Sequence, residues 1–336
     1  DSLLHMDEID AYVLSNHDLI EFSYDPPDEF SKDIGQFVAS LIEDGATMQM
    51  GIGSIPNAIL NEMKDKTDLG VHTEVFSDGI IDLVDEGVIT CDKKSFHKDE
   101  IVTSFVMGSR ELYDFVDGNP LIGFYPSDYV NHPINISKNR RQISINGALE
   151  VDLTGQVNAD SLGPEFYSGV GGHADFVRGA TLSAEGKSII ALPSTGELGE
   201  GRSVSRVVPY LSQGSGVTVT RGDVQFVVTE WGIADLRGKS VRERVLQMIS
   251  IAHPDYREEL LEYAKGQHYV YSDQQLPVSK DGRVCIYPHE YERSLELNDG
   301  EIIQIRPIKP TDERMLQEFY YSMDPQDSYL KFFTIT

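Results

Sequence analysis

A glutamate between a strand-like segment and a glycine turn is the residue of this chain best placed for chemistry. Glu74 stands in the segment Val71-His72-Thr73-Glu74-Val75-Phe76-Ser77-Asp78-Gly79. A carboxylate in this position can be a structural acid, a ligand of a nucleotide ribose or a covalent nucleophile. The groups that surround Glu74 in the folded protein therefore decide among these three roles.

A glycine turn precedes Glu74 along the chain. Gly51 and Gly53 follow an expected strand, so their N–H groups can bind a phosphate or an oxyanion at the start of the next helix. Glu74 lies 21 residues beyond Gly53, near the spacing of the ribose-binding acid in a dinucleotide fingerprint. Pro56 stands where that fingerprint has its third glycine. A dinucleotide site and a plain tight turn therefore both stay open.

A second glycine cluster comes later, in Gly169-Val170-Gly171-Gly172. It allows a ligand to approach the backbone closely, with a flexible loop as the alternative. Asn146 can orient a carboxylate or form an Asn-Gly turn. Glu150 is a rival nucleophile by residue type, although its alternation with Val151 and Asp152 predicts a solvated strand position.

Metal and redox chemistry have little support in the sequence. His72 and Glu74 share one face of an expected strand, but no third ligand is signalled, so no metal is expected. Cys91 and Cys285 have neither metal nor redox spacing. We expect free thiols in a reducing cytoplasm.

Composition narrows the class of partner. The chain has 336 residues, 40% of them hydrophobic, and a net charge of −27, so it is globular and a poor ligand for nucleic acid or anionic membranes. No run of 18 apolar residues predicts a membrane span. An anion site must be made locally, and the candidates for such a patch are Arg178, Arg202, Arg206 and Arg221.

Strands alternate with helices along most of the chain, which predicts an α/β fold with a mixed, largely parallel sheet flanked by helices. The expected helices are 33–43, 57–64, 80–86, 110–116, 240–251 and 314–323. The expected strands are 47–50, 70–75, 101–107, 142–153, 188–193, 216–220, 225–229 and 300–307. The α/β domain is expected to end near residue 268.

Five segments together resemble the acetyl-CoA hydrolase/transferase group of CoA-transferases, close to the 4-hydroxybutyrate CoA-transferases. The segments are 50–56, 72–79, 145–152, 169–176 and 228–238. The resemblance covers roughly residues 1–268 and implies the open α/β domain of this family. It divides the chain into 1–31, a remnant of a preceding domain or a linker, 32–268, the C-terminal catalytic domain, and 269–300, a linker.

The resemblance also implies a site and a reaction. Glu74 would be the nucleophile that becomes a thioester of CoA, Asn146 would hold it, and Glu230 would join the hydrogen-bond network. The backbone contacts to CoA or the thioester oxygen would come from Gly51, Gly53, Gly169, Gly171 and Gly172. One departure is the loop with Glu197 and Glu200, where relatives often carry lysine.

The implied substrates are an acyl-CoA and a short carboxylate of the acetate, butyrate or 4-hydroxybutyrate class. No permanently bound cofactor is expected, and relatives are often dimers, so a homodimer is expected. Three alternatives stay open: an acyl-CoA hydrolase, a dinucleotide-binding domain that uses Gly51, Gly53 and Glu74, and a non-catalytic CoA-binding module.

The last residues carry a different resemblance. The segment 305–313 resembles the opening of a GNAT-type N-acetyltransferase domain, and 319–333 fits its first helices. This implies that 301–336 is the start of such a domain, without its acetyl-CoA loop.

Overall fold

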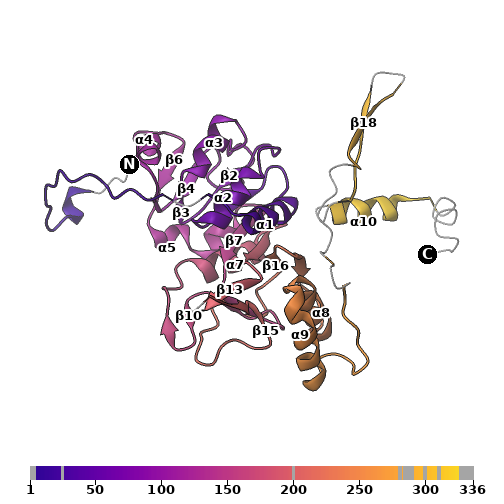
Figure 1. The fold of residues 1–336 in the computed structure, drawn as a ribbon. Coiled ribbons are helices and arrows are strands. Elements are labelled where there is room, and N and C mark those ends of the chain that lie inside the picture. The colour runs from indigo at the N-terminus through magenta and orange to yellow at the C-terminus, as the bar shows by residue number, and fades with distance from the viewer. Residues whose placement is uncertain are drawn as a thin grey trace.

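A six-stranded sheet forms the centre of the computed structural model (Figure 1), which describes residues 5–23, 26–198, 201–278, 282, 291–297, 301–308 and 312–324. The strand order is β17-β16-β12-β7-β1-β2. All neighbours are parallel except β17, which returns antiparallel to β16. The strands are β1 (Thr47–Met50), β2 (Gly70–Val71), β7 (Gln142–Gly147), β12 (Lys187–Ala191), β16 (Phe226–Thr229) and β17 (Gly232–Asp235). The expected α/β class with a mixed, largely parallel sheet is confirmed.

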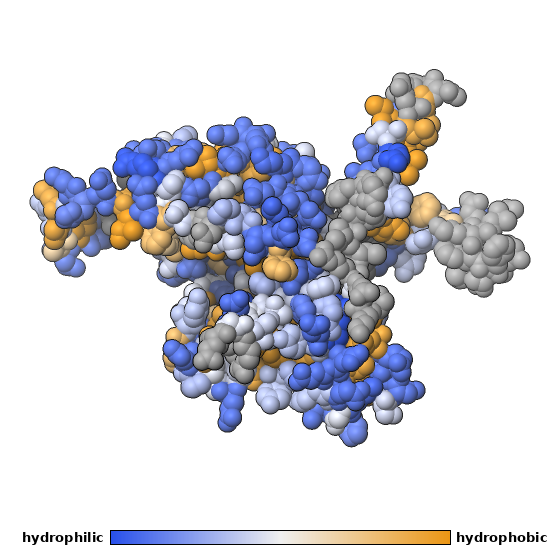
Figure 2. All heavy atoms as spheres, viewed as in Figure 1, coloured by the Kyte–Doolittle hydropathy of each residue, from blue (hydrophilic) through white to orange (hydrophobic). Residues whose placement is uncertain are grey.

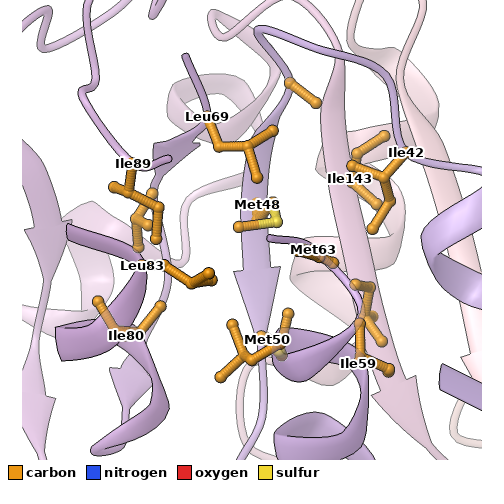
Figure 3. Close-up of a cluster of buried hydrophobic side chains, with 14 of the residues drawn as sticks. Ile42, Met48, Met50, Ile59, Met63, Leu69, Ile80, Leu83, Ile89 and Ile143 are labelled. Carbon is orange, nitrogen blue, oxygen red and sulfur yellow. The ribbon is translucent and has the colours of Figure 1, made fainter. Parts of the chain in front are cut away.

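Helices cover both faces of this sheet, because its strands carry apolar side chains on both sides. Along β12, Ile189 and Ala191 belong to one buried cluster, whereas Ile190 and Leu192 belong to another. The first cluster is completed by α1 (Glu29–Ser40), α2 (Ser54–Asn61) and α3 (Gly79–Asp85), and Figure 3 shows its centre around Met48 and Met50. The second is completed by α7 (His173–Leu182), α8 (Val241–Ile251) and α9 (Pro254–Gly266).

Smaller elements surround the sheet. The small strand pairs are β3 (Val75–Phe76) with β5 (Phe105–Val106), β4 (Ile101–Thr103) with β6 (Ile122–Phe124), β10 (Ser161–Leu162) with β11 (Glu165–Phe166), β13 (Thr195–Leu198) with β14 (Arg202–Ser205), and β18 (Arg293–Glu296) with β19 (Ile302–Ile305). A three-stranded sheet places β8 (Glu150–Asp152) between β9 (Val157–Asn158) and β15 (Val207–Val208). The remaining helices are η1 (Met6–Glu8), α4 (Arg110–Val116), α5 (Ser127–Val130), α6 (Pro133–Ser137) and α10 (Glu313–Ser322).

Several expected strands are interrupted. The segment 70–75 splits into β2 and β3, 101–107 into β4 and β5, and 142–153 into β7 and β8, and the members of each pair join different sheets. The strand expected at 216–220 is wrong, because only Val219 pairs there, in a single bridge to Val157. Local alternation does not reveal these changes of partner, since pairing is decided by residues distant in sequence.

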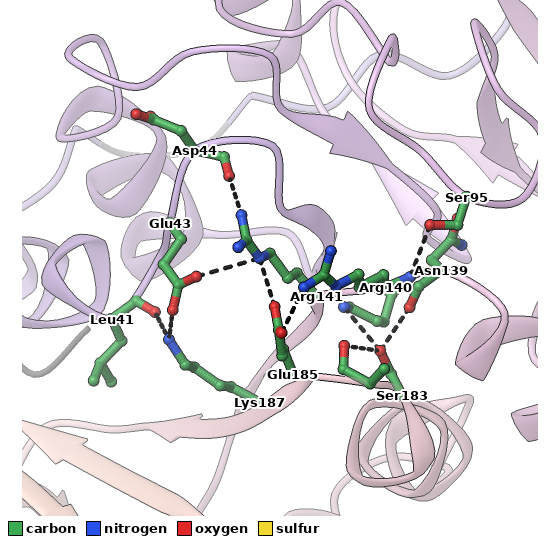
Figure 4. Close-up of polar contacts among 12 residues, drawn as sticks. Leu41, Glu43, Asp44, Ser95, Asn139, Arg140, Arg141, Ser183, Glu185 and Lys187 are labelled. Carbon is green, nitrogen blue, oxygen red and sulfur yellow. Dashed lines mark hydrogen bonds and ion pairs between the residues drawn. The ribbon is translucent and has the colours of Figure 1, made fainter. Parts of the chain in front are cut away.

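An ion-pair cluster joins the loops at the amino edge of the sheet (Figure 4). Glu185 accepts hydrogen bonds from Arg140 Nη2 at 2.6 Å and Arg141 Nε at 2.9 Å, which lower the pKa of Glu185 to about 2. Arg141 and Lys187 also pair with Glu43, at 3.3 and 2.9 Å. The cluster therefore fixes the loops before β1, β7 and β12 at the edge opposite to their carboxyl ends.

The two ends of the chain differ from the central body. The N-terminal segment is extended and exposes apolar side chains, among them Tyr12, Val13 and Leu14, which are 77%, 91% and 89% exposed. Figure 2 shows hydrophobic residues on this segment beside a mostly hydrophilic face. In Figure 1, β18 and α10 lie apart from the central sheet. Within the described residues, no helix is both long and apolar enough to cross a membrane.

Candidate active site

The carboxyl ends of four parallel strands meet at one edge of the sheet and bring most of the predicted site residues together. Gly51 follows β1, Asn146 lies near the end of β7, Ser194 comes three residues after β12, and Glu230 follows β16 directly. Ligands of open α/β sheets bind at this edge, because the loops there are free of the packing that fixes the strands. We therefore expect the ligand site at this edge.

Glu74 reaches this edge because the chain bends between β2 and β3. Thr73 Oγ1 donates to the carbonyl oxygens of Met50 at 3.1 Å and Val75 at 2.9 Å, and so ties the bend to the end of β1. The carbonyl oxygen of Glu74 accepts from Ser104 N at 2.9 Å and Thr103 Oγ1 at 3.1 Å. The backbone is held on both sides, which leaves the partly exposed carboxylate to face the second glycine cluster.

The second glycine cluster contacts the Glu74 carboxylate directly. Gly172 N donates to Glu74 Oε2 at 3.0 Å, just before α7 begins. A Cβ atom on Gly172 would lie only 2.6 Å from Glu74 Oε2, so a glycine is needed for this approach. This contact favours the interpretation of residues 169–172 as a loop that presents an N–H group to a ligand or to Glu74, over the interpretation as a flexible loop.

A second acid lies one turn into α7. Burial raises the pKa of Asp175, the negative charge of Glu74 raises it further, and His132 opposes the rise. The Asp175 carboxylate, on α7, thus has two titratable neighbours: Glu74, from the bend between β2 and β3, and His132, at the start of α6. The site places two carboxylates close together, and their proximity contributes to the raised pKa of Asp175.

The side-chain amide of Asn131, a residue outside the five motif segments, lies beside Glu74. A Cβ atom on Gly172 would be 2.6 Å from Asn131 Nδ2 as well as from Glu74 Oε2, so both side chains crowd the same side of this glycine. The buried Oδ1 of Asn131 has no hydrogen-bond partner among the described residues. Asn131 directly follows α5, in a segment without a recognisable motif. The packing of α5 in the folded protein brings Asn131 next to Glu74 and Gly172.

Asn146 has other partners. Its amide exchanges two hydrogen bonds with the Gln49 side chain, at 3.1 and 3.2 Å, and donates to Ser144 Oγ at 2.8 Å. No hydrogen bond joins Asn146 to Glu74 in the part of the chain that the structure describes. Asn146 and Gly147 lie within β7 rather than in a turn, so the Asn-Gly turn alternative is wrong.

Glu230 is 2% exposed and is bound to the loop after β12. Its Oε2 accepts from Ser194 N at 2.8 Å, and its Oε1 accepts from Ser194 Oγ. The carboxylate thus fixes the start of the β13–β14 hairpin at the carboxyl edge. This hairpin contains Glu197, the acidic departure noted in the sequence, whereas Glu200 lies outside the described residues.

Glu150 is not the solvated strand residue that alternation predicts. It is 6% exposed, and its carboxylate accepts from Asn158 Nδ2 at 3.1 Å and from Ser212 N and Oγ, both at 2.8 Å. A buried carboxylate is stable here because these donors replace its water shell. Glu150 therefore anchors the loop around Ser212 and is a poor candidate for a nucleophile.

The remaining predicted glycines leave room at the edge. A Cβ atom on Gly51, Gly53 or Gly169 would meet nothing within 4 Å, and Gly53 has a φ of +118°, which only glycine adopts readily.

His72 points into the core, where its Nε2 lies 2.9 Å from the Val130 carbonyl oxygen. Burial lowers the pKa of His72 to about 4.

Comparison with known proteins matches this arrangement to one family. Residues 108–264 match the model of the acetyl-CoA hydrolase/transferase C-terminal domain. The chain is 49% identical over 261 residues to the 4-hydroxybutyrate coenzyme A transferase of Clostridium kluyveri. The aligned region covers 78% of this chain and 60% of that protein. The chain is thus similar, over most of its length, to proteins of the acetyl-CoA hydrolase/transferase family.

Two solved structures have a fold similar to that of this chain. RipA from Yersinia pestis superimposes with a TM-score of 0.74 at 41% identity, over 80% of this chain and 60% of that one. The 4-hydroxybutyrate CoA-transferase of Porphyromonas gingivalis gives a TM-score of 0.62 at 43% identity, over 72% and 57% of the two chains. The chain thus spans about 60% of the length of the curated relatives it matches first.

Proposed function

We propose that the protein transfers CoA between an acyl-CoA and a short-chain carboxylate through a covalent glutamyl-CoA thioester on Glu74. The observation that carries the proposal is the hydrogen bond of 3.0 Å from Gly172 N to the Glu74 carboxylate at the carboxyl edge of the sheet. The names of relatives support CoA transfer, among them a butyryl-CoA:acetate CoA-transferase that is 39% identical over 239 residues.

The reaction begins with attack of a Glu74 carboxylate oxygen on the thioester carbonyl carbon of the acyl-CoA. The C–S bond breaks, CoA leaves as a thiolate, and an acyl-glutamyl anhydride forms. The thiolate then attacks the Glu74 carbonyl carbon and expels the first carboxylate, which leaves a glutamyl-CoA thioester. An incoming carboxylate reverses these steps. Nucleophile and acceptor are both carboxylates, so the transfer of CoA between them replaces one thioester by another of similar energy.

Each step at Glu74 passes through a tetrahedral oxyanion, and Gly172 is the group that stabilises it. Its N–H already lies at hydrogen-bond distance from a Glu74 oxygen, and this oxygen remains on the carbon throughout the exchange. Such a fixed donor requires no reorganisation as charge develops. Loss of one donor of this kind slows an acyl transfer by about 10²–10³.

The other site residues act by position. Asn131 lies beside the same carboxylate and can hold its resting orientation. Asn146 acts through Gln49, next to the end of β1, and Glu230 holds the loop after β12. Gly51, Gly53, Gly169 and Gly171 leave open backbone for the CoA thioester arm, which is a substrate and not a resident cofactor.

A trapping experiment on the full-length protein tests the proposal. The protein is incubated with acetyl-CoA, reduced with borohydride and mapped by peptide mass spectrometry, and we expect the reduced glutamyl product at Glu74. Glu74→Gln should give no adduct and no CoA transfer. Glu150→Gln, the matched control, should give the wild-type adduct. An adduct at Glu150, or transfer activity without an adduct at Glu74, would contradict the mechanism.

Hydrolysis is a second candidate, supported by a specific relative and by the site. The chain is 31% identical over 258 residues to an acetyl-CoA hydrolase of Yarrowia lipolytica, and Glu74 is partly exposed to water. Water that attacks the glutamyl-CoA thioester would release CoA and restore Glu74. Release of CoA from acetyl-CoA in the absence of a carboxylate acceptor distinguishes this activity from transfer.

We propose the same domain limits as the motifs imply: 1–31 as the preceding remnant or linker, 32–268 as the catalytic domain, and 269–300 as a linker. Residues 301–336 are proposed as the start of a GNAT-type domain. Support comes from the resemblance of the segment 305–313 to the opening of such a domain. We also propose a homodimer, by analogy with the family.

A further inference from the structure

An arginine without a described partner lies at the same edge of the sheet as Glu74. Arg206 connects β14 to β15, and its backbone is fixed on both sides. Its N–H donates to the Ser194 carbonyl at 2.8 Å, and its own carbonyl accepts from Val151 N at 2.9 Å. Ser194 is the residue that holds Glu230. The Cα of Arg206 is therefore anchored to the loop that follows β12.

The guanidinium of Arg206 lies next to Gly196 in the β13–β14 hairpin. A Cβ atom on Gly196 would lie 2.5 Å from Arg206 Nε and 3.0 Å from Nη2. Gly196 thus admits the guanidinium where any larger residue would displace it. This contact fixes the direction of a long side chain that would otherwise have many conformations.

No described residue accepts a hydrogen bond from this guanidinium or forms an ion pair with it. The other partly buried arginines with described side chains all have acceptors: Arg141 bonds Glu185, Arg244 bonds the carbonyls of Thr154 and Arg221, and Arg257 bonds those of Ala252 and Gly282. Burial lowers the pKa of Arg206, opposed by Tyr167 and Glu230. In a chain of net charge −27, a partly desolvated cation without a partner among the described residues needs an explanation.

The neighbours of Arg206 connect it to the site. Glu230 interacts with it electrostatically from the end of β16, and Tyr167 does so from the segment that leads to Gly171 and Gly172. Gly172 in turn contacts the Glu74 carboxylate. Arg206 therefore lies between the loop after β12 and the glycine loop of the proposed nucleophile.

We propose that Arg206 binds an oxyanion of the substrate, either a phosphate of CoA or the carboxylate of the acceptor. This inference rests on the proposed function, in which both substrates carry such a group. A planar guanidinium binds phosphate or carboxylate through two parallel hydrogen bonds, which recover the desolvation of the buried cation. It would also add positive charge beside the β13–β14 hairpin, which carries Glu197 and Glu200.

Steady-state kinetics of the Arg206→Gln variant of the full-length protein test the proposal, with acetyl-CoA as donor and butyrate as acceptor. We expect the KM for one of the two substrates to rise at least about tenfold, with kcat changed less than about threefold, as for loss of a charged hydrogen bond to a bound group. Arg206→Lys should restore part of the loss. Arg110→Gln, which removes an exposed arginine paired with Asp114, is the matched control and should keep wild-type constants.

Separate substrates identify the oxyanion. A rise in the KM for acetyl-CoA that is absent with 3′-dephospho-acetyl-CoA assigns the 3′-phosphate, and a rise with both thioesters assigns the diphosphate. A rise for butyrate alone assigns the carboxylate. Unchanged KM values for both substrates, or a fall in kcat alone, would overturn the role of Arg206 in oxyanion binding. Transfer by the wild-type protein would still support the proposed function in that case. A wild-type protein without transfer or a Glu74 adduct would overturn both.

Discussion

At the scale of single residues, the site depends on which atoms surround one carboxylate. Glu74 is identifiable in the sequence because it stands in an unusual motif, and the structure adds the partners that spacing does not reveal. Gly172 donates to Glu74 Oε2, and Asn131 Nδ2 crowds the same position. Asn146, the amide that the motif favours, bonds Gln49 instead. The sequence motif singles out Glu74, the proposed nucleophile, whereas the tertiary structure decides which residues surround it.

The substitution Gly172→Ala should reduce kcat by at least about 10², in line with the loss of an oxyanion donor. The added Cβ atom would lie 2.6 Å from Glu74 Oε2 and from Asn131 Nδ2, so the carboxylate must move away from the N–H group. Steady-state kinetics of CoA transfer measure this effect. Gly266→Ala, where a Cβ atom meets nothing within 4 Å, controls for the loss of a glycine. Wild-type kcat in Gly172→Ala would exclude this N–H group from the reaction.

At the scale of elements, interruptions of strands build the site. The bend between β2 and β3 presents Glu74, and it is held by Thr73 on one side and by buried His72 on the other. His72 also receives a hydrogen bond of 3.3 Å from Asn139 Nδ2, so the bend is anchored to the segments after α5 and α6. Alternation predicted one strand here, because apolar spacing is unchanged when a chain switches from one sheet to another.

His72 predicts a pH dependence of stability. Its pKa is about 4 in the folded protein, below the ordinary value of 6.5, so the unfolded chain binds the proton more readily between these values. The contribution of His72 to the free energy of unfolding should therefore be complete above pH 6.5 and decrease as the pH falls toward 4. The decrease should amount to up to about 1.4 kcal/mol per pH unit. His173, whose pKa burial also lowers to about 4, adds a similar slope.

Urea unfolding at pH 7, 6 and 5 measures this slope, and titration of the His72 ring protons by NMR assigns it. His72→Gln should reduce the slope, whereas His17→Gln, in the exposed N-terminal segment, should leave it unchanged. An NMR pKa of His72 near 6.5 in the folded protein would contradict the prediction.

At the scale of the whole molecule, the two edges of the sheet are specialised. The amino edge carries the paired charges of Figure 4, where Glu43 and Glu185 each bind two cations. The carboxyl edge carries Glu74, Asp175 and Arg206 with few compensating partners. Paired charges stabilise the first edge, and incomplete pairing at the second leaves groups available for substrates. The chain as a whole carries 55 acidic and 28 basic residues.

This excess predicts that moderate salt stabilises the protein. Acidic residues outnumber basic ones about twofold, so repulsion among like charges exceeds the attraction of the ion pairs. Raising the ionic strength from about 0.01 M to 0.15 M shortens the screening length from about 30 Å to 8 Å and should raise the Tm. Thermal unfolding in NaCl and in choline chloride measures the effect and separates screening from sodium binding. A lower Tm in both salts would contradict the prediction.

The sequence by itself determined the α/β class, the parallel sheet, most helices and the identity of the site loops. Gly51, Gly171, Gly172 and Glu74 stand out in local patterns of strand, glycine turn and helix, which depend on neighbours along the chain. Glu230 was indicated only by the resemblance to the CoA-transferases. Only the tertiary structure decided that Glu150 is buried, that Asn131 lies beside Glu74 and that Arg206 lacks a described partner. These three facts arise from contacts between residues far apart in sequence, and no local spacing records such contacts.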